Sequence, residues 1–148
     1  MPPITRRFLF AAAASLLIGV GLGSWLLARR ELAGVWPSPY LVSAHVHLVM
    51  VGAVLQVIAG VALWMFPRPL RDDTRRHEAY GIIGWWLLTP GTFLRAAAEA
   101  SKAWVGWSWL PGVVVAGALM QLVGIACVLF ALRTRLRPSG AVSRREPV

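Results

Sequence analysis

The sequence has few charged residues and almost no cysteine, and each shortage excludes a class of protein. Only 14% of its 148 residues are charged, whereas 57% are hydrophobic and the mean hydropathy is +0.64. One small soluble domain cannot hide that much apolar surface, so we predict an integral membrane protein whose solvent is the lipid bilayer. The single cysteine, Cys127, excludes an intrachain disulfide and a cysteine zinc cluster.

Four apolar segments predict an all-α bundle of four transmembrane helices, because each is about 20 residues long or longer. The segments are residues 8–28, 40–66, 79–98 and 110–132. The first is followed by Arg29 and Arg30 and not by a small-residue cleavage site, which favours a span over a signal peptide. We expect one transmembrane domain, residues 1–138, and a flexible tail, residues 139–148.

The basic residues lie at the ends of the apolar segments. The net charge of +9 therefore indicates topology signals and lipid headgroup contacts, and not nucleic-acid binding. If the N-terminus is inside, eleven basic residues are on the inner side and four on the outer side. The inner residues are Arg6, Arg7, Arg68, Arg71, Arg75, Arg76, Arg133, Arg135, Arg137, Arg144 and Arg145, and the outer ones are Arg29, Arg30, Arg95 and Lys102. This bias predicts cytoplasmic N- and C-termini in a multi-pass protein of a bacterial-type cytoplasmic (inner) membrane.

Small and amide residues mark possible contacts between the helices. Gly19 and Gly23 are four residues apart, as are Gly112 and Ala116. Such spacing lets helix backbones approach closely, although glycine is frequent in membrane helices in any case. Gln56 lies mid-membrane, as does Gln121, and we expect each to form hydrogen bonds between helices.

Two of the three histidines, His45 and His47, lie near the outer end of the second span. Ionisable groups in a span are costly and usually functional, and neutral imidazole binds iron, copper and zinc well. Residues two apart on a helix point about 200° away from each other, so both imidazoles cannot bind one metal on a regular helix. His77 follows the second span, and we expect it on the opposite, cytoplasmic side.

The stretch from Ser43 to Arg68, Ser-Ala-His-Val-His-Leu-Val-Met-Val-Gly…Trp-Met-Phe-Pro-Arg, resembles the second transmembrane helix of haem-copper oxidase catalytic subunits. The nitric oxide reductase and cbb3-type branch is the most similar. In that family the helix begins with a His-Thr-Asn-like triplet whose histidine is an axial ligand of the low-spin haem. The resemblance implies that His45 is the haem ligand, and that His47 stands where the family has asparagine.

The chain departs from this family in its size and its histidines. It has three histidines in all, with no match to the copper-ligand helix, to the high-spin haem ligand or to the second low-spin ligand. We therefore do not expect an enzyme that reduces oxygen or nitric oxide. The resemblance implies a small stand-alone relative that binds haem b.

A second chain can supply the missing axial ligand, because isologous contacts in a two-fold dimer pair equivalent surfaces. We expect a homodimer in which His45 faces the partner's His45 or the partner's His47. A bis-histidine iron has no open position, which favours electron transfer with a respiratory partner, or redox or gas sensing, over catalysis. Arg29, Arg30 and Arg95 are candidate partners for the haem propionates, and lipid headgroups are the alternative partners of these cations.

Two other interpretations remain open at this point. His45 and His47 could bind copper or zinc in a protein of oxidase assembly. The chain could also be a structural accessory subunit of a respiratory oxidase.

Overall fold

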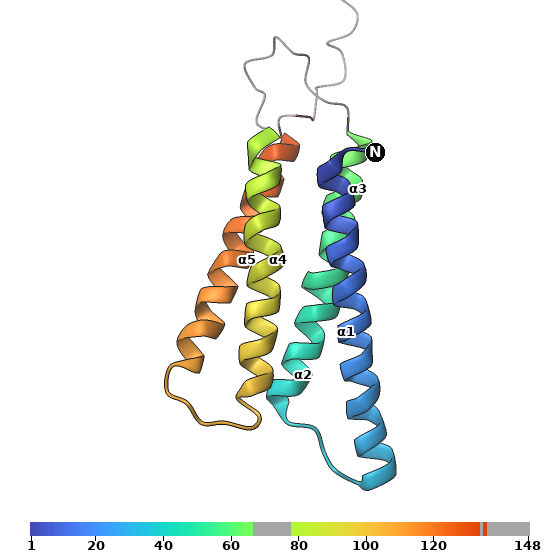
Figure 1. The fold of residues 1–148 in the computed structure, drawn as a ribbon, viewed down its shortest axis with the longest axis vertical. Helices are drawn as coiled ribbons and strands as arrows, with labels where there is room; N and C mark the ends of the chain where they lie inside the picture. The colour runs from blue at the N-terminus through green and yellow to red at the C-terminus, as the bar shows by residue number, and fades with distance from the viewer. Residues whose placement is uncertain (67–77, 134, 136–148) are drawn as a thin grey trace, which may run out of the picture.

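All regular secondary structure in the described residues is helical. The computed structural model describes residues 1–66, 78–133 and 135. The elements are α1 (Pro3–Ala33), α2 (Pro39–Val46), η1 (His47–Leu55), α3 (Gln56–Met65), α4 (Glu78–Ser101) and α5 (Leu110–Arg133). Because α2, η1 and α3 follow one another without a break, they form one long rod antiparallel to α1 (Figure 1).

Three helical rods in the described part of the chain are long and apolar enough to cross a membrane. They are Pro3–Ala33, Pro39–Met65 and Leu110–Arg133. The third expected span exists as α4, but it is not one of these three apolar rods, and Arg95 and Glu99 lie on it. The fold is thus that of a helical membrane protein. The start of α1 and the end of α5 lie at the same end of the bundle (Figure 1).

The first helix is longer than the apolar segment that predicted it. It begins at Pro3, where proline's missing N–H is no loss, and continues past residue 28 to Ala33. Arg29 and Arg30 do not stop it, because arginine is a good helix former. Gly34 stops it, with a φ of 65° that disfavours other residues, and its N–H bonds to the Arg30 carbonyl at 3.1 Å.

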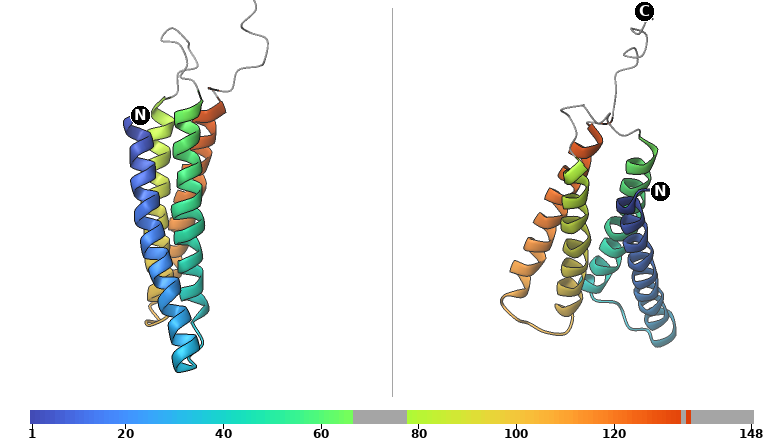
Figure 2. Two further views of the ribbon diagram at one scale, coloured as in Figure 1. Left: turned by 90° about the vertical axis from the view of Figure 1, so that its right-hand side faces the viewer. Right: turned by 45° about the horizontal axis from the view of Figure 1, so that its top comes forward.

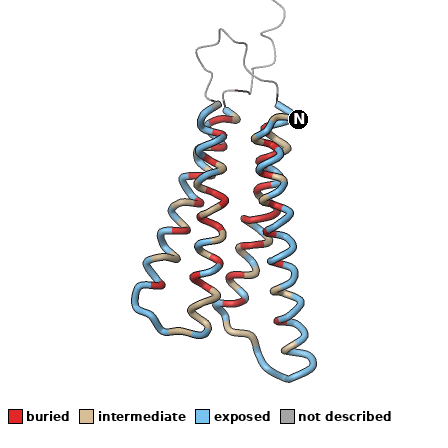
Figure 3. Tube along the Cα trace, viewed as in Figure 1, coloured by how far each residue is buried: buried red, intermediate tan, exposed pale blue. Residues whose placement is uncertain are grey.

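The helices pack as two antiparallel pairs (Figures 1 and 2). One pair is α1 with the α2–η1–α3 rod, and the other is α4 with α5. An apolar core joins the pairs near the end that holds the N-terminus. There Phe8 and Leu63 pack with Leu88 and Val128. Buried residues line the contacts between helices, and the outward faces are exposed (Figure 3).

The middle of the second rod is a π-helix. The nine residues of η1 begin at His47, directly after α2, and end at Leu55. A π-helix has wider turns than an α-helix, and short π segments occur frequently at functional sites. The hydropathy of residues 40–66 carries no signal for this change of helix type, which the sequence analysis did not predict.

The glycine spacing predicts one helix contact correctly and a second one wrongly. A Cβ on Gly19 would lie 2.9 Å from Val49, and one on Gly23 would lie 2.5 Å from the His45 ring. Gly112, in contrast, has no neighbour within 4 Å, and Ala116 is exposed. The face of α5 that packs on α4 carries Gly117 and Gly124, because the side of a helix that contacts its neighbour depends on the partner as well as on spacing.

Candidate functional site

His45 lies between α2 and α1, and its ring is fixed by a backbone carbonyl. The Nδ1 atom is 2.7 Å from the oxygen of Gly19. A carbonyl only accepts, so Nδ1 carries the hydrogen and donates it. In the neutral ring the lone pair is then on Nε2, which is the nitrogen left for a ligand. Gly23 leaves the room that the ring occupies, because any Cβ there would overlap it.

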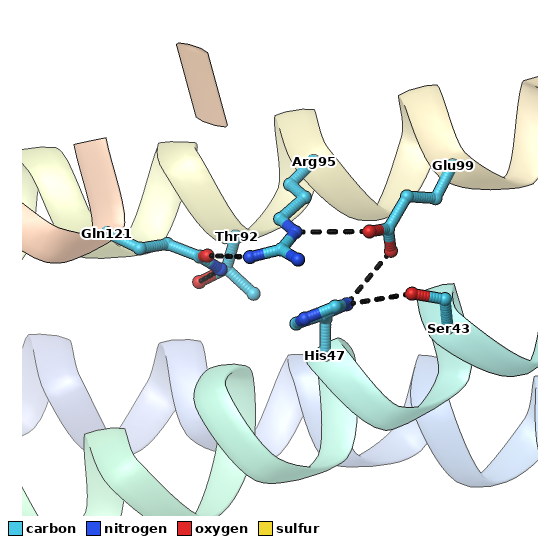
Figure 4. A network of polar contacts seen from close by, with 6 residues as sticks. All are labelled: Ser43, His47, Thr92, Arg95, Glu99 and Gln121. Carbon is cyan, nitrogen blue, oxygen red and sulfur yellow. Dashed lines mark hydrogen bonds and ion pairs between the residues drawn. The ribbon is translucent and has the colours of Figure 1, made fainter. Parts of the chain in front are cut away.

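His47 faces a different helix. Its Nδ1 lies 2.9 Å from Oε2 of Glu99 on α4, and Ser43 Oγ is 3.4 Å from the same nitrogen (Figure 4). The two histidines therefore diverge as the helical angle predicts, one toward α1 and the other toward α4. They do not converge on one metal position.

Glu99 is the centre of a charged network inside the bundle. Only 6% of its side chain is exposed, and its Oε1 accepts a hydrogen bond of 3.1 Å from Nε of Arg95. Arg95 and Glu99 are one turn apart on α4, which is the spacing at which opposite charges pair on a helix. Ala44, Leu48 and Ala96 form a buried apolar cluster between the same two rods, and an interior of low polarity strengthens the interaction of buried charges.

The network continues across to α5 through amide and hydroxyl groups (Figure 4). Arg95 Nη1 donates to Oε1 of Gln121 at 3.1 Å, and Gln121 Nε2 donates to Thr92 Oγ1 at 3.1 Å. Thr92 in turn donates to the carbonyl of Leu88. The network thus ties both helix pairs together. Gln56 accepts a 2.9 Å bond from Thr89, so both glutamines bond between helices as predicted.

The two outer arginines of α1 have different partners. Arg30 forms an ion pair with Glu31 at 2.6 Å, and its guanidinium lies 5.7 Å from the Trp36 ring centre. Arg29 lies over the Trp25 ring at 5.2 Å and lines a pocket of about 160 Å³ next to Trp36 and Trp104. No carboxylate among the described residues forms an ion pair with Arg29.

The sequence pointed to His45, His47 and Arg95 as candidates but did not predict the groups that contact them. The Glu99 partner of His47 is 52 residues away, and the Gly19 partner of His45 is a backbone atom. An acidic residue one turn after an arginine in an apolar segment was the available signal for Glu99. His77 and the tail, residues 139–148, lie outside the described residues.

Among the described residues, no three histidine, cysteine, aspartate or glutamate side chains gather where they could hold a metal ion. No family model, curated protein or solved structure matches the chain. The resemblance of residues 43–68 to the oxidase helix therefore depends on those residues alone.

Proposed function

We propose that the chain is a membrane protein that binds haem b through His45 and takes part in electron transfer or in redox or gas sensing. The observation that carries the proposal is the 2.7 Å bond from His45 Nδ1 to the Gly19 carbonyl. Histidines that bind a metal almost always donate their other ring N–H to a carbonyl, carboxylate or water, which fixes the ring and its tautomer. His45 has this arrangement, and Nε2 is the nitrogen free to bind iron.

The neighbouring residues also fit a haem ligand. Gly23 leaves room for the His45 ring. The π-helix begins at His47, two residues after His45, and short π-helices are common at functional sites. Haem, when bound, would supply a one-electron redox centre. The protein would hold the ring, exclude water with the apolar sides of α1 and α2, and provide a cation for the propionates.

Arg29 is the best of the three candidate cations for the propionates. Arg95 already bonds to Glu99 and Gln121, and Arg30 already pairs with Glu31. Arg29 forms no such pair within the described residues and lies on α1, six residues beyond the glycine that contacts His45. We therefore assign the propionate contact to Arg29 ahead of Arg95 and Arg30.

We further propose that a second copy of the chain completes the iron coordination. His47 bonds to Glu99 on the far side of the rod, so it is not beside the same iron position. Val42, Val46 and Met50 form an exposed apolar stripe on α2 and η1, which a second copy could cover. In this arrangement α4 is the fourth span, with its charged residues turned inward, and both termini are cytoplasmic.

The test is the absorbance spectrum of protein purified from haem-replete cells. We expect a low-spin, six-coordinate spectrum and one haem per two chains, which corresponds to pairing of His45 with the partner's His45. One haem per chain would indicate pairing with the partner's His47. The His45→Ala variant should be colourless, and His77→Ala should keep the haem. A colourless wild-type protein that binds copper would favour the metal-binding alternative, and one with neither cofactor would favour a structural subunit.

A further inference from the structure

The interior of the helix bundle holds buried polar atoms that form no hydrogen bond within the described residues. Ser15 and Gln56 are both fully buried, with 0% of each residue exposed. The hydroxyl of Ser15 and the amide nitrogen of Gln56 form no hydrogen bond. An unpaired polar group in an apolar interior costs free energy, and the bilayer core offers no solvent to satisfy it.

These two groups lie on the helices that meet at Gly52. A Cβ on Gly52 would be 2.7 Å from Ser15 Oγ and 3.2 Å from the Thr92 methyl carbon. Gln56 is one turn further along the same rod, where its oxygen accepts a bond from Thr89 of α4. Gly52 thus lets Ser15 of α1 and Thr92 of α4 approach η1 closely, one turn before Gln56.

We propose that an internal water molecule binds beside Gly52, held by Ser15 Oγ and Gln56 Nε2, the two buried atoms without a partner. Buried water is found where two to four polar groups would otherwise be unpaired, and the two orphan groups supply an acceptor and a donor. Thr92 is near Gly52 through its methyl carbon, whereas its hydroxyl bonds to Gln121 and to the Leu88 carbonyl. This proposal does not depend on haem.

The direct test uses the two glutamines, because Gln56 and Gln121 are the only ones in the chain. The full-length protein, labelled with ¹⁵N-glutamine, is placed in lipid bilayers, and magnetisation is transferred from water to the side-chain amides by solid-state NMR. The signal that disappears in Gln56→Met identifies Gln56. We expect this amide to receive magnetisation from water. No transfer to Gln56, while exposed backbone amides receive it, would overturn the proposal.

A thermal measurement gives an independent answer through the sign of its effect. If the Ser15 hydroxyl binds water, Ser15→Ala removes a hydrogen bond, and Tm should fall by about 3 °C. If the position is dry, the same substitution removes an unpaired hydroxyl, and Tm should rise, which would contradict the proposal. Ser24→Ala is the matched control, because Ser24 lies on the same helix and is exposed.

Discussion

The two helix pairs both use glycine, but they use it for different purposes. Between α4 and α5, glycine brings backbones together: a Cβ on Gly124 would lie 2.7 Å from the Leu88 backbone nitrogen, and one on Gly91 would lie 3.1 Å from the Gly117 oxygen. Between α1 and the second rod, glycine makes room for side chains. Gly23 accommodates the His45 ring, and Gly52 accommodates Ser15.

The difference separates glycines that let two backbones approach from glycines that make room for a polar side chain. Between α4 and α5, close backbone approach accompanies the hydrogen bonds of Gln121 to Arg95 and Thr92, so packing and polar contacts together hold this pair. A glycine opposite a histidine or a serine instead leaves room for that polar side chain and restricts its orientation. The spacing of glycines does not distinguish the two uses, so the side chain opposite each glycine decides which one applies.

The largest expected effect is in the α4–α5 contact. Gly124→Leu forces a side chain against the Leu88 backbone, which cannot rotate away, and should destabilise the protein by about 3 kcal/mol. Thermal unfolding followed by circular dichroism measures the loss. Gly112→Leu is the control, because Gly112 has no neighbour within 4 Å. Equal stability of the two variants would contradict the view that α4 and α5 are held by backbone contact.

The next largest effect is expected where Glu99 of α4 contacts His47 of the second rod. Glu99→Gln removes the charge that Arg95 and His47 both contact, and leaves Arg95 without its counter-ion in an apolar setting. Because Arg95 is 24% exposed, we expect a loss of about 2 kcal/mol, below the full cost for a buried pair. Chemical unfolding in detergent measures it. A neutral result would mean that the apolar core around Phe8, Leu63 and Leu88 is sufficient to hold the two pairs together.

Gly23→Ala tests the use of glycine beside His45. The added methyl would lie 2.5 Å from the ring carbon Cε1, so the ring must leave its place while the helix can remain. If His45 binds haem, affinity should fall about tenfold, as is typical when the group that orients a ligand is lost. Haem titration measures the change. Gly21→Ala, which meets nothing within 4 Å, should bind like the wild type, and a matching loss there would refute the steric explanation.

The smallest effect is expected at Ser43. Its hydroxyl is 3.4 Å from His47 Nδ1, which is long for a hydrogen bond, whereas Glu99 contacts the same nitrogen at 2.9 Å. Ser43→Ala should therefore change the free energy of unfolding by less than about 0.5 kcal/mol. A loss as large as that of Glu99→Gln would show that Ser43, and not Glu99, fixes the His47 ring.

Hydropathy and helical geometry predicted the helices and the direction of the histidines. The four expected segments are all helical. The angle between helix positions two residues apart directs His45 toward α1 and His47 toward α4. Arg95 and Glu99 pair one turn apart on the same helix, a spacing that can be read from the sequence although the ion pair itself was not predicted. These are local properties, which a single sequence contains.

Contacts between distant segments could not be predicted in the same way. The His47–Glu99 contact joins α4 to the second rod, and it depends on the rotation of both. Gly112 and Ala116 had the right spacing on the wrong face of α5, since the contacting face depends on where α4 lies. The prediction that α4 spans the membrane stays untested, because α4 does not have the uniform apolarity of the other rods.

The π-helix makes the second rod sensitive to changes in length. Removing one residue between His47 and Leu55 would rotate the part before the deletion by roughly a quarter of a turn relative to the part after it. His45 would then rotate away from Gly19 and Gly23 of α1, while Gln56 and Thr89 would stay in contact. The deletion would therefore separate the two contacts that the rod makes on either side of η1, that of His45 with α1 and that of Gln56 with α4.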